Sequence, residues 1–197
     1  WSDGSCLGYG RGRKPDDAEF MFMRDVDYCS GAFLLTPRDL FERLGRFDES
    51  YAPAYYEETD YCVRVWKENL RVVYNPKATV QHFEFASSGK VSDALLLQER
   101  NLETFRQRHA DWLAKQYQPD EANILRARFH APSRPRILFI EDRIPKGWLG
   151  AGFPRAADIV RELSEAGMQV TVFPTAGQPE NWHDIWNAQS LDVEVIL

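Results

Sequence analysis

The pattern that most constrains the fold is a strand, a glycine-rich loop, a helix and a second strand in the last third of the chain. In order these are strand Arg136–Ile140, a loop with Gly147, Gly150 and Gly152, helix Pro154–Ala166 and strand Met168–Phe173. A helix that joins two strands predicts a parallel, right-handed crossover unit. The run Asp192–Leu197 predicts a third strand. Since a doubly wound sheet has more strands, we expect a truncated Rossmann-like βαβ unit at 136–197.

The middle of the chain predicts a different organisation. Ser92 can cap a long helix from Asp93 to about Gln116, and the proline-containing, charged segment 118–135 is typical of a linker. We therefore expect one domain at 1–117, a linker at 118–135 and a second domain at 136–197. The fold class is α/β.

The first domain is expected to mix strands and helices after a loop-like segment at 1–24. Its expected elements are a buried strand Tyr28–Leu35, a helix capped by Thr36 and ended by Gly45, a helix Thr59–Lys67 and strands Leu70–Tyr74 and Ala78–Phe83.

Charge and cysteine usage exclude several classes of function. The chain has 24 Lys+Arg against 30 Asp+Glu and no strongly basic segment, so we expect no nucleic-acid partner. It has no apolar run of about 18 residues, which a membrane-spanning helix needs, and its opening segment does not resemble a signal peptide. Three cysteines make no disulfide framework, and Cys29 and Cys62 are expected as small core residues in a reducing compartment.

The densest polar cluster is Tyr55–Asp60, which places Glu57, Glu58 and Asp60 at an expected helix start. One interpretation is helix capping, because carboxylates near a helix N-terminus interact well with its free N–H groups. The other is general-base catalysis, because crowded carboxylates raise one another's pKa.

Two further motifs are candidates for metal binding. His82 lies late in an expected strand, where a single histidine is usually structural and would need carboxylate partners to bind a metal. Asp25-Val26-Asp27 is a D-x-D pattern that could hold a divalent cation, but only a loop-like segment precedes it. We interpret that short pattern as a chance match.

Four sequence blocks resemble the C-terminal half of family 2 glycosyltransferases, which have the GT-A fold, and among these the rhamnosyltransferase-like enzymes of bacterial surface-polysaccharide assembly. The blocks, in order, are RDVDYCSGA from Arg24, FERLGRFDE from Phe41, YAPAYYEETD from Tyr51 and YNPKATVQHFE from Tyr74. The resemblance implies a partial GT-A domain, its acceptor half, followed by the long helix.

The resemblance also implies a reaction and its residues. It implies an inverting transfer of a sugar from a nucleotide-sugar donor to a glycan or lipid-linked acceptor, with Mg²⁺ or Mn²⁺ as cofactor. By the resemblance, Glu58 is the catalytic base, a position at which the family usually has Asp. The remaining implied roles are orientation of the base for Glu57 and Asp60, substrate binding for Ser30, Gly31, Ala32 and Arg64, and metal binding for His82.

The same resemblance implies a location and an incomplete enzyme. It places the protein in the cytoplasm, peripherally associated with the inner face of a membrane that carries lipid-linked glycan. The family's nucleotide-binding half precedes the quoted blocks, so we expect a fragment of a larger enzyme, inactive alone. The Gln-x-x-Arg-Trp block of processive synthases is absent from this sequence.

The region 136–197 resembles the start of a GT-B glycosyltransferase domain, with Gly150 and Gly152 either at a substrate or in a plain strand-to-helix turn. Two alternatives stay open. Ile140-Glu141-Asp142 is similar to the acidic pocket of phosphoacceptor receiver domains. The first domain could instead be a non-catalytic carbohydrate-binding remnant whose Tyr55, Tyr56 and Trp66 stack on sugars.

Overall fold

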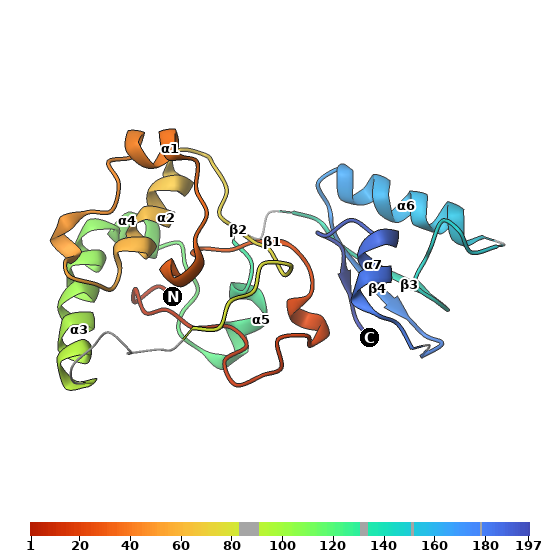
Figure 1. Cartoon of the computed structure of the whole chain (residues 1–197), viewed down its shortest axis with the longest axis horizontal. Coiled ribbons are helices and arrows are strands. Elements are labelled where there is room, and N and C mark those ends of the chain that lie inside the picture. The colour runs from red at the N-terminus through yellow and green to blue at the C-terminus, as the bar shows by residue number, and fades with distance from the viewer. Residues whose placement is uncertain (83–90, 131–133, 151, 178) are drawn as a thin grey trace. The chain divides into compact units, whose positions relative to one another are not determined.

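The computed structural model describes the chain except for residues 83–90, 131–133, 151 and 178 (Figure 1). The chain divides into two compact units, each described by itself. Unit 1 comprises Trp1–Tyr9, Asp25–Tyr74 and Thr79–His130, and unit 2 comprises Gly10–Arg24, Asn75–Ala78 and Ala131–Leu197. The fold is mixed α/β, and none of the described helices combines the length and apolar character that crossing a membrane requires.

The α-helices are α1 (Arg38–Arg43), α2 (Glu57–Lys67), α3 (Val91–Arg108), α4 (Ala110–Leu113), α5 (Ile124–Ala127), α6 (Phe153–Glu165) and α7 (Trp182–Ala188). The strands are β1 (Arg24–Asp25), β2 (Val73–Tyr74), β3 (Arg136–Glu141), β4 (Gln169–Pro174) and β5 (Glu194–Val195). Short 3-10 helices are η1 (Ala18–Phe20), η2 (Gly31–Phe33), η3 (Glu49–Tyr51) and η4 (Glu121–Asn123).

Unit 2 contains the expected parallel unit. Strands β3, β4 and β5 form one parallel sheet in sequence order, with Arg136 opposite Gln169 and Val172 opposite Val195. Helix α6 connects β3 to β4 and ends where Gly167 adopts a φ of +83°. The prediction of a parallel crossover at 136–173, with a third strand after it, is confirmed.

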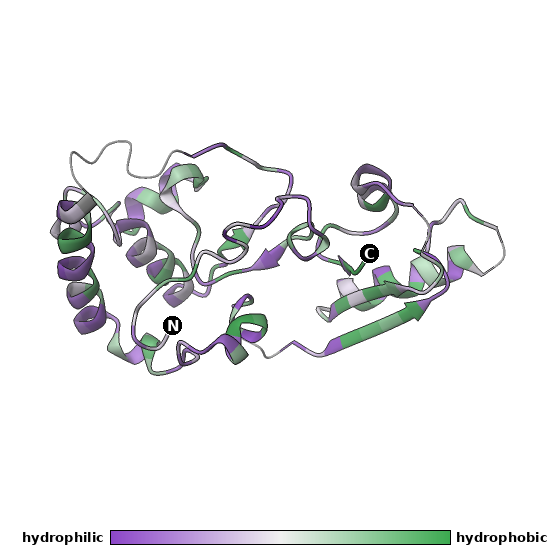
Figure 2. Cartoon of the chain, turned by 90° about the horizontal axis from the view of Figure 1, so that it is seen from below, coloured by the Kyte–Doolittle hydropathy of each residue, from purple (hydrophilic) through white to green (hydrophobic). Residues whose placement is uncertain are grey.

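One face of this sheet carries the core of unit 2. Val160 of α6 and Ile185 of α7 pack with Val170 and Val172 of β4 in one buried cluster. Strand β3 was expected to be buried, but its side chains alternate, and Leu138 is 59% exposed. The strand is half-buried because both helices contribute to the cluster on one face. Figure 2 shows the strands as mainly hydrophobic.

Residues 10–24, expected as a loop, pack within unit 2. Phe20 of η1 and Phe22 are buried. The indole nitrogens of Trp182 and Trp186 in α7, a helix that was not predicted, donate to the carbonyl oxygens of Asp16 (3.1 Å) and Met21 (2.9 Å).

Unit 1 is built around α2. The helix begins two residues earlier than expected, so that Glu57 and Glu58 lie in its first turn. One side of α2 packs on α3 and α4 through Val63, Phe105 and Leu113. Another side of α2 buries Cys62 in a cluster with Val72. Cys62 is 1% exposed, as expected for a small core cysteine.

Several local predictions in unit 1 are wrong. The run Tyr28–Leu35 is not a buried strand. The Ser30 hydroxyl accepts a hydrogen bond from the Ala32 N–H and caps η2. Leu35, after this turn, is 96% exposed. The expected strand Leu70–Tyr74 shortens to β2, which pairs with β1. Residues 78–82 have no regular structure, and the remainder of that expected strand, Phe83, lies outside the described residues.

The start of α1 and the course of the long helix also differ from expectation. Helix α1 begins at Arg38 after Pro37, and the Thr36 hydroxyl, expected as its cap, instead bonds the Tyr61 hydroxyl at 2.7 Å. The helix expected at 93–116 is divided into α3 and α4 at His109. Its predicted apolar face is wrong at its start, where Leu95 is 51% exposed, and α3 is largely hydrophilic in Figure 2.

Candidate functional site

The first turn of α2 brings a predicted base next to a predicted substrate segment. The Glu58 Oε1 atom lies 3.5 Å from the Gly31 backbone N, at the outer limit of a hydrogen bond. A Cβ added to Gly31 would lie 3.5 Å from the Glu58 Cβ, an ordinary van der Waals distance, so the Glu58 side chain lies close to the Gly31 backbone. Ser30, Gly31 and Ala32 are all exposed, so this contact lies beside an accessible backbone segment.

Each glutamate of the turn has one carboxylate oxygen that is not used in the contacts of the described residues. The Oε2 atoms of Glu57 and Glu58 are buried and, among the described residues, have no hydrogen-bond partner. Burial raises the pKa of Glu57, and the charge of Glu58 adds to this, while the Glu57 backbone N–H opposes it. A carboxylate with a raised pKa accepts a proton more readily than an ordinary one.

The surroundings of Glu58 carry neutral proton donors. Burial is the main reason that the pKa values of Tyr28 and Tyr56 are raised, and the Glu58 carboxylate raises both of them further. Both hydroxyls therefore stay uncharged at neutral pH.

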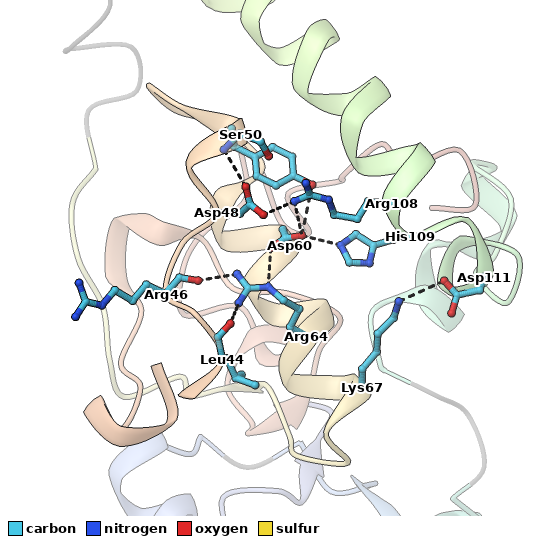
Figure 3. Close-up of polar contacts among 11 residues, drawn as sticks. Leu44, Arg46, Asp48, Ser50, Asp60, Arg64, Lys67, Arg108, His109 and Asp111 are labelled. Atoms are coloured by element: carbon cyan, nitrogen blue, oxygen red, sulfur yellow. Dashed lines mark hydrogen bonds and ion pairs between the residues drawn. The ribbon is translucent and has the colours of Figure 1, made fainter. Parts of the chain in front are cut away.

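Asp60 has a different environment (Figure 3). It is 1% exposed, and its Oδ1 bonds His109 Nε2 at 2.8 Å while its Oδ2 accepts from Arg64 Nε at 2.7 Å. Burial alone raises the pKa of Asp60, but the hydrogen bonds from His109 and Arg64 outweigh it and lower the pKa. Its Oδ1 thus joins α2 to the residue between α3 and α4, while its Oδ2 pairs with Arg64 within α2. A catalytic role for Asp60 stays a prediction.

Arg64 is also engaged by the protein. Besides its bond to Asp60, its two remaining guanidinium nitrogens donate to the carbonyl oxygens of Leu44 and Arg46 (Figure 3). The guanidinium lies 5.4 Å from the centre of the Tyr61 ring. Substrate binding by Arg64 stays a prediction, and the geometry shows a side chain that fixes the loop after α1.

The predicted metal ligand His82 is exposed and directly precedes residues that the structure does not describe. Among the described residues, no three His, Cys, Asp or Glu side chains gather as a metal site would require. The residues seen here therefore do not supply a complete donor set for Mg²⁺ or Mn²⁺. The D-x-D aspartates are paired internally, Asp25 with Arg71 and Asp27 with His130, both at 2.7 Å.

Two of the three aromatic rings considered for sugar stacking pack within unit 1. Tyr56 lies 5.4 Å from Phe105, and its hydroxyl donates to the Gly4 carbonyl. Trp66 stacks on His130 with ring centres 3.5 Å apart. These contacts give both rings a structural role.

In unit 2, a cavity of about 300 Å³ opens where β3 and β4 end. It is lined by Asp142, Arg143, Ile144, Pro174, Gly177, Pro179, Glu180 and Leu197. Neither Gly150 nor Gly152 has a neighbouring atom where a Cβ would lie, so the turn has space for side chains at both positions. The GT-B-like and receiver-like interpretations of this unit stay predictions.

One residue beside the site was missed from the sequence. Asn101 of α3 is 0% exposed and donates from Nδ2 to the carbonyl oxygens of Tyr51, Ala54 and Tyr55. The signal available was a short polar side chain within a long amphipathic helix, a position where Asn is unfavourable unless its amide has partners.

Comparison with known proteins gives a partial relationship. No family model and no solved structure matches the chain. The chain is 39% identical over 67 residues to an N-acetylglucosaminyl-diphospho-decaprenol L-rhamnosyltransferase of Mycobacterium tuberculosis, matched in two strains. The match covers 34% of this chain and 22% of the relative, so the chain spans about a fifth of the length of the relatives it matches. Over this stretch the chain is related to a glycosyltransferase.

Proposed function

We propose that unit 1 is the acceptor side of an inverting glycosyltransferase similar to family 2 enzymes, with Glu58 as the catalytic base. One observation carries the proposal: the Glu58 carboxylate has a buried oxygen for which the described part of the chain offers no partner, and its other oxygen lies 3.5 Å from the Gly31 N of the exposed segment Ser30–Ala32. The partial similarity to a rhamnosyltransferase supports it.

The chemistry requires little of the protein besides a well-placed base. An acceptor hydroxyl is a weak nucleophile, and a carboxylate within hydrogen-bond reach can take its proton as the new bond forms. The acceptor oxygen bonds to the anomeric carbon, the bond from that carbon to the diphosphate breaks, and the nucleoside diphosphate leaves with the electron pair. Attack from the opposite face inverts the anomeric centre.

The remaining residues of the turn orient this base. Glu57 lies next to Glu58 and contributes a second carboxylate, and Asp60 holds the helix through His109 and Arg64. In this proposal the exposed Gly31 and Ala32 backbone borders the acceptor. Mg²⁺ or Mn²⁺ stays part of the proposal, because a divalent cation would neutralise the charge that develops on the leaving diphosphate; the described residues supply no complete set of ligands for it.

The relative's name suggests the substrate class. We propose a nucleotide-activated L-rhamnose as donor and a lipid-diphosphate-linked sugar as acceptor. A lipid-linked acceptor places the protein at the inner face of the plasma membrane, as a peripheral protein. We also propose that this chain is part of a larger enzyme, which contains the nucleotide-binding half.

Acceptor binding is testable on this chain. We expect a soluble lipid-diphosphate-linked N-acetylglucosamine analogue to shift the NMR amide signals of Gly31 and Ala32, and the shifts to weaken in Glu58→Gln. Unchanged Gly31 and Ala32 signals at millimolar analogue would contradict the proposal.

Transfer is tested with labelled nucleotide-activated L-rhamnose, the same analogue and Mg²⁺ or Mn²⁺, in the enzyme that contains the donor-binding half. We expect a product of inverted anomeric configuration, identified by proton NMR. A product of retained configuration would exclude the mechanism, and binding without transfer in that enzyme would favour the scaffold alternative.

A further inference from the structure

The backbone that leads into the glutamate turn has an unusual conformation. Tyr55 and Tyr56, the two residues before Glu57, have φ angles of +75° and +74°. L-residues other than glycine rarely adopt this left-handed region, and two in succession persist only where the surrounding structure holds them. The direction in which α2 starts is therefore set by whatever holds residues 51–56.

Two neighbouring residues of α3 hold this loop. The Asn101 Nδ2 donates to the carbonyl oxygens of Tyr51 at 2.8 Å, Ala54 at 2.8 Å and Tyr55 at 2.9 Å. The Arg100 Nη2 donates to the carbonyl oxygen of Ala52 at 2.7 Å, and its Nε donates to the Asn101 Oδ1 at 3.0 Å.

The Asn101 side chain is specific for this task. The two N–H groups of its amide nitrogen are shared among three carbonyl oxygens, whereas a carboxylate in the same place would carry no donor. Asn101 is fully buried, so no water competes for these bonds, and loss of the donor would leave backbone carbonyls unsatisfied. This amide group therefore supplies the buried side-chain donors to the loop, and Arg100 adds a further bond at Ala52.

The loop in turn determines where the glutamates lie. Tyr56 is the residue before α2, and its ring packs 5.4 Å from Phe105 of the same helix α3. Glu57 and Glu58 follow immediately, each with one buried oxygen that has no partner among the described residues. A change in the backbone at 54–56 would move both carboxylates.

We propose that Asn101 is a positioning residue that, with Arg100, holds the backbone of 51–55 so that Glu57 and Glu58 stay half-buried beside Ser30–Ala32. Its relevance to catalysis rests on the proposed function. The positioning role itself does not rest on that function, because the burial of the two carboxylates can be measured without a reaction.

The test is a carboxyl-carbon NMR titration of Glu57 and Glu58 in the whole 197-residue chain. In the unmodified protein we expect Glu57 to titrate above the ordinary glutamate range. In Asn101→Ala, we expect the pKa of Glu57 to fall toward that range as the turn opens to water. In Asn101→Ser, which keeps one donor, the pKa of Glu57 should lie between its values in the unmodified protein and in Asn101→Ala.

Two controls separate positioning from general loss of stability. Gln107→Ala removes an exposed amide from the same helix and should leave the titration unchanged. Val72→Ala weakens a different buried cluster of unit 1 and should lower stability without changing the pKa of Glu57. An equal pKa change in Val72→Ala, or none in folded Asn101→Ala, would overturn the proposal.

A measurement on the unmodified protein decides the matter if the Asn101 variants do not fold. We expect the side-chain amide hydrogens of Asn101 to exchange with solvent far more slowly than those of Gln107. Equally fast exchange of both would contradict the proposal.

Transfer kinetics provide a separate readout. In the enzyme that contains the donor-binding half, Asn101→Ser should lower kcat at least tenfold with little change in the KM for donor. Absence of transfer in every form would reject the proposed function, while the titration would still decide the role of Asn101. An unchanged kcat would reject the positioning role.

Discussion

Asp60 is a buried residue that links α2 to the junction of α3 and α4. Its carboxylate joins His109, at the junction of α3 and α4, to Arg64, which reaches the loop after α1 (Figure 3). Three separate segments of the chain thus meet at one buried negative charge. Removing one partner of a buried pair leaves the others without compensation.

We predict that Asp60→Asn lowers the free energy of unfolding by about 3 kcal/mol, since breaking a buried ion pair from one side has this effect. Urea denaturation followed by circular dichroism measures it. Asp111→Asn is the matched control, because Asp111 is 71% exposed and pairs only across 3.3 Å with Lys67. Equal losses of stability in the two variants would show that the Asp60 network does not stabilise the fold.

The same residue predicts a dependence of stability on pH. The pKa of Asp60 is lower in the folded protein than its ordinary value of 3.8, so its contribution is complete above that value. It is lost as the pH falls through the lowered pKa. The stability difference between the unmodified protein and Asp60→Asn should therefore shrink below about pH 4. Denaturation midpoints between pH 7 and pH 3 test this, and a difference that grows toward low pH would contradict it.

Among the elements, helix α6 shows how a local signal fixes a boundary. It ends at Gly167, whose φ of +83° lies in the left-handed region. We predict that Gly167→Ala lowers the free energy of unfolding of unit 2 by about 1 kcal/mol, since a Cβ is unfavourable there. Gly150→Ala is the control, because Gly150 has open space around it and no positive φ. Thermal unfolding that affects both variants alike would contradict the prediction.

Elements defined by local patterns were predictable from the sequence, and those defined by distant contacts were not. The β3–α6–β4 unit follows from an apolar run, a helical period and a glycine, all within a short stretch. The break between α3 and α4 coincides with His109, whose ring reaches the Asp60 carboxylate 49 residues earlier in sequence. The exposed turn at Gly31–Phe33 resembled a strand because its apolar composition did not reveal the Ser30 cap.

At the scale of the whole molecule, the two units interleave along the chain. Residues Gly10–Arg24 precede most of unit 1 in sequence but belong to unit 2. The sequence predicted a linear division near 118–135, because an interleaved segment leaves no local signal. The expected domains at 1–117 and 136–197, joined by a linker at 118–135, stay a prediction.

We predict that a chain shortened to 134–197 is less stable than unit 2 with its N-terminal segment. It would lose the carbonyl partners of the Trp182 and Trp186 indoles and the cover provided by Phe20 and Phe22. Adding a peptide of residues 10–24 should raise its melting temperature and shift its tryptophan fluorescence to shorter wavelength. No effect of the peptide would show that the segment contributes nothing to unit 2.

The candidate site was predictable in part. The sequence singled out Glu57, Glu58 and Asp60 as carboxylates crowded at an expected helix start. The base role of Glu58 and the substrate segment Ser30–Ala32 came from the resemblance. That Glu58 contacts Gly31, 27 residues earlier, required the fold. Asn101 was missed because the bonds that define its role are made to backbone carbonyls 46 to 50 residues away.

The most direct test of the proposed mechanism is the turnover of Glu58→Gln in the enzyme that contains the donor-binding half. Loss of a general base lowers the rate by about 10²- to 10⁴-fold, so we predict a fall of that size in kcat. Glu68→Gln, an exposed glutamate just after the other end of α2, should keep full activity. A Glu58→Gln enzyme that turns over as fast as the Glu68→Gln enzyme would contradict the account.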